Sequence, residues 1–122
     1  MTGKELVANL FEEFFNNHDF SAIDKYLHPN YIQHDWDVPD GRDGFRDHFK
    51  QVFEMLPHFH VEVKHILEDG DMVVMHGYGI PDAGKREVLV VDIYRVEDGL
   101  LVEHWGTVQP LSPEQFGNPR LM

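Results

Sequence analysis

The segment VLVVDIYRV, residues 88–96, is a run of strand-forming residues with a carboxylate at its centre. Alternation along a strand places Val90, Asp92 and Tyr94 on one face. The opposite face is also apolar, which is typical of a central strand that is covered on both sides. The chemistry of this segment therefore depends on what surrounds Asp92.

An ionised carboxylate buried without a partner costs on the order of several kcal/mol, so Asp92 is expected to be neutral, hydrogen-bonded or paired. A carboxylic acid that keeps its proton can donate a hydrogen bond to an oxyanion that forms on a substrate. The structural alternative is an ion pair with an arginine such as Arg42 or Arg46, or a hydrogen bond accepted from a Trp or Tyr.

The strand that follows, LLVEHWGTVQ at residues 100–109, also carries polar residues between apolar ones. A two-residue turn at residues 98–99 would place Trp105 opposite Asp92. A loop longer by one residue would place His104 there instead. The sequence leaves both registers open.

His34 ends the short extended segment YIQH and is followed by Asp35. An imidazole titrates near neutral pH, so it can take a proton from a carbon acid and return it elsewhere. The chain has nine histidines, so a surface position is an equally good interpretation of His34 alone.

The HFH segment places His58 and His60 on one strand face, where two imidazoles could chelate a metal. A solvated strand edge is the better interpretation of this segment, so no metal is expected.

Periodicity predicts three helices followed by an antiparallel meander. Thr2 and Glu5 have capping-box spacing before a helical apolar face, and Pro29 and Pro57 are expected to end the second and third helices. Period-two alternation then predicts four strands at residues 58–67, 71–80, 88–96 and 100–109. We expect an α+β fold with one core and a cavity between the concave sheet face and the first helix. The tail from residue 110 is either a loose terminus or a strap across a neighbour.

Composition narrows the class of protein. With 122 residues the chain is expected to form one domain, residues 1–122. A formal charge of -12 would repel a phosphate backbone or an anionic membrane, so neither nucleic acid nor membrane is an expected partner. Cysteine is absent, so neither a disulfide nor a metal bound by cysteine is expected. The first twenty residues lack the apolar core of a signal peptide, so a cytoplasmic location is expected by default.

The order of elements, together with DFSAIDKYLHPNYIQHD and VDIYRVEDGLLVEHW, resembles the nuclear transport factor 2-like superfamily, and within it the SnoaL-like polyketide cyclase group. The resemblance covers almost the whole chain. It implies a cone-shaped α+β barrel, in which three N-terminal helices pack on a curved antiparallel sheet. It also implies that the protein needs no cofactor and forms a homodimer. Ketosteroid isomerase, which belongs to the same superfamily, uses an Asp base and a protonated Asp.

Against that superfamily, VDIYRV resembles the strand that carries the protonated Asp, which matches Asp92. The end of YIQH resembles the segment of the general base, which matches His34, with Asp35 as the rival. His104 falls where the family has a pocket residue near the protonated Asp. These matches imply catalytic roles for His34, Asp92 and His104.

Two positions depart from the resemblance. Phe11 stands where the isomerases have a tyrosine, and Gly106 stands where HWG replaces an expected pocket Asp. Both are expected to line the substrate site, together with Asp35, Trp36, Val90 and Tyr94.

The first hypothesis is a cofactor-independent enzyme that removes a proton next to a carbonyl of a small apolar substrate, in an aldol-type cyclisation or an isomerisation. It would be a lyase or an isomerase. The second is a non-catalytic binding or dimerisation module of the same fold, which Gly106 and Phe11 favour. Either hypothesis predicts a small hydrophobic carbonyl compound as ligand and a homodimer through the convex sheet face.

Overall fold

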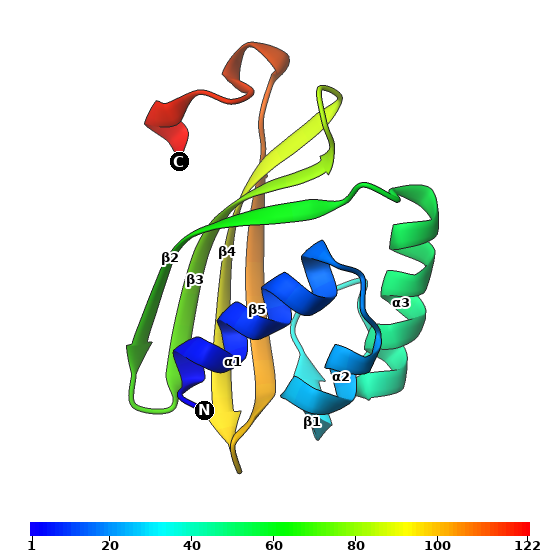
Figure 1. Ribbon diagram of the computed structural model, residues 1–122, viewed down its shortest axis with the longest axis vertical. Helices are drawn as coiled ribbons and strands as arrows, with labels where there is room; N and C mark the ends of the chain where they lie inside the picture. Colours follow the sequence, from blue (N-terminus) through cyan, green and yellow to red (C-terminus); the bar gives the residue numbers. More distant parts are fainter.

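The computed structural model describes all residues from 1 to 122, and it confirms the α+β fold (Figure 1). The helices are α1 (Gly3–Leu10), α2 (Ser21–Tyr26) and α3 (Gly41–Met55), and α1 continues as a π-helical turn, Phe11–Asn16. The strands are β1 (Leu27–Gln33), β2 (His60–Asp69), β3 (Met72–Asp82), β4 (Arg86–Glu97) and β5 (Leu100–Pro110). Helix α1 lies across one face of the curved sheet, and α3 lies beside it.

The sheet has the order β1-β5-β4-β3-β2, so β4 is the central strand, as its apolar sequence predicted. Strands β2 to β5 form the expected antiparallel meander. A fifth strand, β1, joins the meander at one edge and runs parallel to β5, so the sheet is antiparallel except at this edge. The meander leaves β5 with an unpaired edge, and β1, which precedes α3 in the chain, supplies the missing hydrogen bonds there.

Helix α1 begins as its capping box predicted. The Thr2 hydroxyl accepts a hydrogen bond from the Glu5 amide at 3.1 Å, and the Glu5 carboxylate accepts one from the Thr2 amide at 2.9 Å. The helix then buries Leu6, Val7 and Leu10 against the sheet. This contact fixes the helix that covers the inner face of the sheet.

Phenylalanine rings form the part of the core between the helices. Phe14 lies at the centre, with ring centroids at 5.1 to 5.6 Å from those of five others, Phe15, Phe20, Phe45, Phe49 and Phe53. Aromatic pairs at such distances stabilise one another beyond their burial. The cluster joins the π-helical turn to α3 and forms the apolar end of the pocket described below.

A β-bulge in β5 determines which of its residues face Asp92. The hairpin has the two-residue turn, because Glu97 pairs with Leu100 and Val96 with Leu101. Arg95 then pairs with Glu103, so Val102 is the extra residue of a bulge. The bulge moves every later pair by one residue.

Both registers considered from the sequence are therefore wrong. Gly106 lies directly opposite Asp92, and His104 lies opposite Tyr94. Paired residues share a face of an antiparallel sheet, so Asp92, His104 and Gly106 all point to the inner face. Trp105 points to the outer face. A local irregularity that the turn sequence does not encode thus places the imidazole next to the carboxylate.

The tail folds back on its own sheet as a strap. The Leu111 amide donates to the Glu87 carbonyl at 3.1 Å, and the Gly117 amide donates to the Tyr78 hydroxyl at 2.8 Å. Short 3-10 turns follow at Pro113–Gln115 and Pro119–Leu121.

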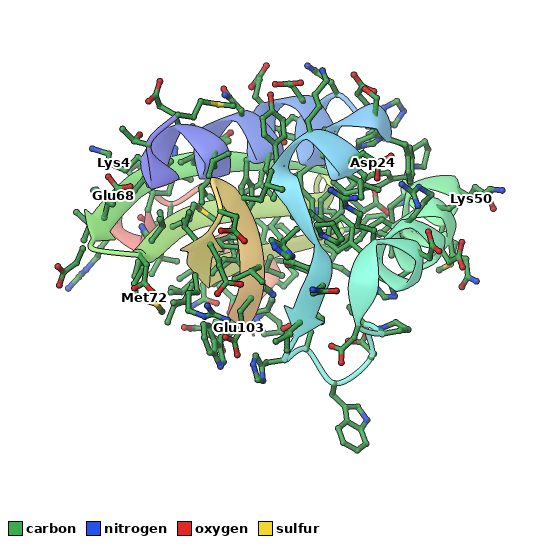
Figure 2. All side chains as sticks on the ribbon, turned by 90° about the horizontal axis from the view of Figure 1, so that it is seen from below. Lys4, Asp24, Lys50, Glu68, Met72 and Glu103 are labelled. Atoms are coloured by element: carbon green, nitrogen blue, oxygen red, sulfur yellow. The ribbon has the colours of Figure 1, made fainter.

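The outer face of the sheet has no helical layer. Seen from below, α1 lies over one side of the strands, whereas the labelled Met72 and Glu103 point away from the other side (Figure 2). None of the helices is long and apolar enough to cross a membrane.

Candidate active site

A cavity of about 140 Å³ lies between the inner face of the sheet and the helices. Its apolar wall is formed by Phe11, Phe15, Phe45, Phe49, Phe59, Val61, Val90 and Val108. Its polar residues are Tyr31, Gln33, Asp35, Asp92, Tyr94 and His104. Two adjoining cavities, of about 390 and 530 Å³, share wall residues with it and lead outward. An apolar cavity with a few convergent polar groups is typical of a small-molecule site.

The closest polar contact in the cavity joins His104 and Asp92, from neighbouring strands. Nε2 of His104 lies 2.7 Å from Oδ1 of Asp92, and His104 is only 5% exposed. On the other side of the ring, Nδ1 is hydrogen-bonded to Oε1 of Gln33 in β1. The imidazole is thus held at both nitrogens.

These contacts determine how many protons the pair holds. Gln33 Oε1 also lies 3.4 Å from the Asp35 amide, so it accepts hydrogen bonds, and Nδ1 of His104 must be the donor. One proton then lies between Nε2 and Asp92, carried either by the ring or by the carboxyl group. In both states the Asp92–His104 pair is neutral overall, and the proton on this contact points at its partner instead of into the cavity.

Asp35 is the second carboxylate beside the same imidazole. Its Oδ2 lies 3.7 Å from Nδ1 of His104, and the side chain is half-buried. Burial raises the pKa of Asp35, the attraction of His104 opposes that rise, and the repulsion of Asp92 adds to it. A carboxylate with a raised pKa is a better proton acceptor near neutral pH.

His34 makes no contact with Asp92, although both residues border the adjoining cavity of about 390 Å³. Its Nε2 lies 2.8 Å from Oε2 of Glu103, and its ring stacks on Trp105 with a centroid distance of 4.8 Å. Both partners belong to the outer face of β5, and Glu103 is visible there in Figure 2. The reason is strand alternation, which sends Gln33 and Asp35 inward and His34 outward.

The proposed arginine partners of Asp92 are engaged elsewhere. Arg42 donates from Nε to the Leu27 carbonyl at 2.9 Å. Arg46 pairs with Asp24 at 3.0 Å. The His104 imidazole is therefore the group that offsets the cost of removing the Asp92 carboxylate from water.

The remaining predicted residues divide into two groups. Phe11, Val90 and Tyr94 line the cavity as expected. Trp36 does not pack on it, because its side chain is fully exposed, at 101%, on the loop after β1. Trp36 and His34 border only the adjoining cavity of about 390 Å³.

Sequence reasoning missed Gln33 and Tyr31. Both lie on β1 at positions that alternate with His34, on the same side as Asp35. Period-two alternation through YIQHD would have grouped these three residues and separated His34 from them.

The histidines of the HFH segment form no metal cluster. Nδ1 of His60 lies 3.0 Å from the His58 carbonyl oxygen, so it serves as a donor there. A group of His28, Glu97 and Asp98 lies close together at the β4–β5 hairpin, but Nδ1 of His28 accepts from the Asn30 amide and the site is largely exposed.

Gly106 leaves the space in which Asp92 and His104 meet. A Cβ atom at this position would lie 2.7 Å from Oδ1 of Asp92 and 3.0 Å from Cε1 of His104. Both distances are shorter than van der Waals contact allows. The carboxylate of Asp92 thus lies where a side chain at position 106 would be.

The comparisons with known proteins agree with this architecture. Residues 7–104 match the SnoaL-like domain, so the chain belongs to the SnoaL-like family, within the nuclear transport factor 2-like superfamily. Among curated protein sequences none matches.

Several crystal structures share the fold. IdmH from Streptomyces antibioticus, provisionally assigned as a polyketide cyclase, is 24% identical with a TM-score of 0.70, over 85% of this chain and 89% of its own. A cystatin-fold protein from Novosphingobium aromaticivorans is 19% identical with a TM-score of 0.77, over 88% and 98%. AclR from Streptomyces galilaeus, provisionally assigned as a hydroxylase, is 21% identical with a TM-score of 0.72, over 92% and 81%. The fold is common to differently assigned proteins, so function must be argued from the site.

We expect Gly106→Ala to separate Asp92 from His104, because the added methyl group overlaps both. Overpacking of this kind lowers the free energy of unfolding by about 1–3 kcal/mol. Denaturant unfolding measures the loss, and the ¹⁵N shifts of the His104 ring report the broken contact, with the distant His28 ring as internal reference. Unchanged His104 shifts would show that the pair tolerates the methyl group.

We expect Asp35→Asn to stabilise the protein at neutral pH and to have little effect in acid. The folded pKa of Asp35 is raised, so its ionised form is disfavoured by folding, and wild-type stability falls as pH rises through that pKa. Below the unfolded pKa both states are protonated and the difference disappears. Urea unfolding at a series of pH values measures this trend, with Asp37→Asn, an exposed acid two residues away, as the matched control. A constant difference between variant and wild type would contradict it.

Proposed function

We propose that the protein is a cofactor-independent enzyme that removes a proton from the carbon next to a carbonyl group in a small, largely apolar substrate. The observation that carries this proposal is one buried imidazole flanked by two carboxylates inside an apolar cavity. Such groups support proton transfer, which contributes on the order of 10²–10⁴ in rate.

Asp35 is the base in this proposal. It is half-buried, borders both the inner cavity and the adjoining cavity of about 390 Å³, and has a raised pKa. The proton passes from the substrate carbon to the Asp35 carboxylate, and the electron pair of the broken C–H bond moves into the enolate. Return of the proton to another carbon gives an isomerisation. Attack of the enolate on a second carbonyl forms an alkoxide, which takes the proton back from Asp35, and this gives an aldol cyclisation.

The Asp92–His104 pair adds no net charge to the polar end of the cavity while this happens. Ionised Asp35 is attracted to the imidazole ring, and Asp92 supports any positive charge on that ring. The apolar wall formed by the phenylalanines excludes water, which strengthens these interactions.

The second candidate is a binding module that uses the same cavity without chemistry. Phe11 favours it, since an apolar ring lines the wall where the isomerases have a tyrosine. The experiment below separates the two candidates, because a module would hold a ketone without exchanging its protons.

The test is solvent deuterium exchange, followed by NMR, into a panel of small ketones and β-keto esters incubated with the protein. We expect Asp35→Asn to lower the exchange rate at least about a hundredfold, since the base is lost. His34→Ala is the matched control, because His34 neighbours Asp35 but faces outward, and it should retain wild-type exchange.

Two results would contradict the proposal. Equal exchange by folded Asp35→Asn and wild type would show that Asp35 is not the base. Absence of exchange by wild type over the whole panel would favour the binding module.

We also propose a homodimer through the outer sheet face. This face carries half-exposed apolar side chains on three neighbouring strands, Val74, Val91, Ile93 and Trp105, and no helix covers it. Sedimentation at micromolar concentration should give a dimer, and Val91→Lys, which places a charge at the centre of the face, should give a monomer. A monomeric wild type would contradict this assignment.

A further inference from the structure

The hydroxyl of Tyr31 is the one buried side-chain polar atom in the protein that lacks a hydrogen-bond partner. Tyr31 is 1% exposed, and its ring is fixed by an edge-to-face contact with Phe45 at 5.8 Å. A buried hydroxyl without a partner costs free energy, and such groups are rare in folded proteins. Its retention in a cavity wall calls for a functional reason.

The surroundings of this hydroxyl keep it a donor. Burial, followed by the charges of Asp92 and Asp35, raises the pKa of Tyr31 well above the usual range, so the phenol keeps its proton. The Gln33 side chain lies near enough to oppose this rise, but it makes no hydrogen bond of normal geometry to the hydroxyl. Gln33 Oε1 is already engaged by His104.

Among the other polar groups at this end of the cavity, only the Tyr94 hydroxyl is also a protonated phenol, and the Tyr94→Phe variant below compares the two. Both ring nitrogens of His104 are bonded, and the proton on Asp92 or His104 lies in the contact between them. Asp92 therefore does not supply the hydrogen bond to a substrate oxygen that the sequence suggested. Ionised Asp35 can only accept.

We propose that the Tyr31 hydroxyl donates the hydrogen bond to the carbonyl oxygen of the ligand, and to the negative charge that develops there when Asp35 removes the proton. This inference rests on the function proposed above. It places the oxyanion donor on β1, two residues from the Gln33 that orients His104, whereas the first helix contributes Phe11 to the same cavity.

The test uses 4-nitrophenol, whose ionised oxygen resembles that of an enolate and whose ionisation is visible by absorbance. Binding is measured in the Asp35→Asn protein, because this neutral side chain resembles Asp35 after it has accepted the proton. We expect Tyr31→Phe to weaken binding of the phenolate about ten- to a hundredfold, since a hydrogen bond to a charged oxygen is lost. Tyr26→Phe, whose hydroxyl binds Glu13 outside the cavity, is the matched control and should bind as before.

A second readout separates binding from a structural role. Without ligand, Tyr31→Phe removes no hydrogen bond, so its urea midpoint should equal or exceed that of the parent. Tyr26→Phe loses the bond to Glu13 and should unfold at lower urea. A fall in the midpoint of Tyr31→Phe as large as that of Tyr26→Phe would show that the hydroxyl is already satisfied within the fold.

The remaining outcomes are distinct from a failure of the proposed function. Three results would each overturn the role of Tyr31, even if ketones exchange their protons. They are equal phenolate binding by Tyr31→Phe and its parent, no phenolate binding by the parent, and a larger loss of binding from Tyr94→Phe than from Tyr31→Phe. Phenolate binding that depends on Tyr31, with no ketone exchange by wild type, would support the donor and overturn only the enzymatic proposal.

Discussion

The Asp92 carboxylate on the central strand is only 18% exposed, and the group that compensates its loss of water is the imidazole of His104 at 2.7 Å. Three features of the fold serve this contact. The bulge at Val102 turns His104 to the inner face, Gly106 leaves room beside it, and Gln33 holds the far side of the ring. The polar end of the cavity is built around this pair.

The contact also distributes roles among the polar groups. Because Asp92 and His104 share a proton with each other, neither presents one to the cavity. Under the two proposals above, Asp35, whose pKa is raised by burial, is the proton acceptor, and Tyr31 is the donor. Each of these groups lies on β1 or its end, so the parallel pairing of β1 with β5 assembles both sides of the site.

The aromatic cluster gives the site its apolar character. Phe14 joins the π-helical turn to α3, and neighbouring rings such as Phe15, Phe45 and Phe49 form the cavity wall. A low-dielectric wall strengthens every charge interaction beside it, which is why burial dominates the pKa of both Asp35 and Tyr31. The same residues thus stabilise the fold and tune the chemistry.

The helices, the meander and the family could be predicted from the amino-acid sequence, because capping, periodicity and apolar alternation are local signals. The position of Asp92 on an inner face of the sheet could be predicted as well. The partner of Asp92 depends on the three-dimensional structure, because the bulge at Val102 changes the facing residue without a turn signal. The pairing of β1 with β5 brings Asp35 and Tyr31, but not His34, to the inner cavity that Asp92 borders. Strand register depends on hydrogen bonds between distant segments, so one extra residue exchanges the faces of every position that follows.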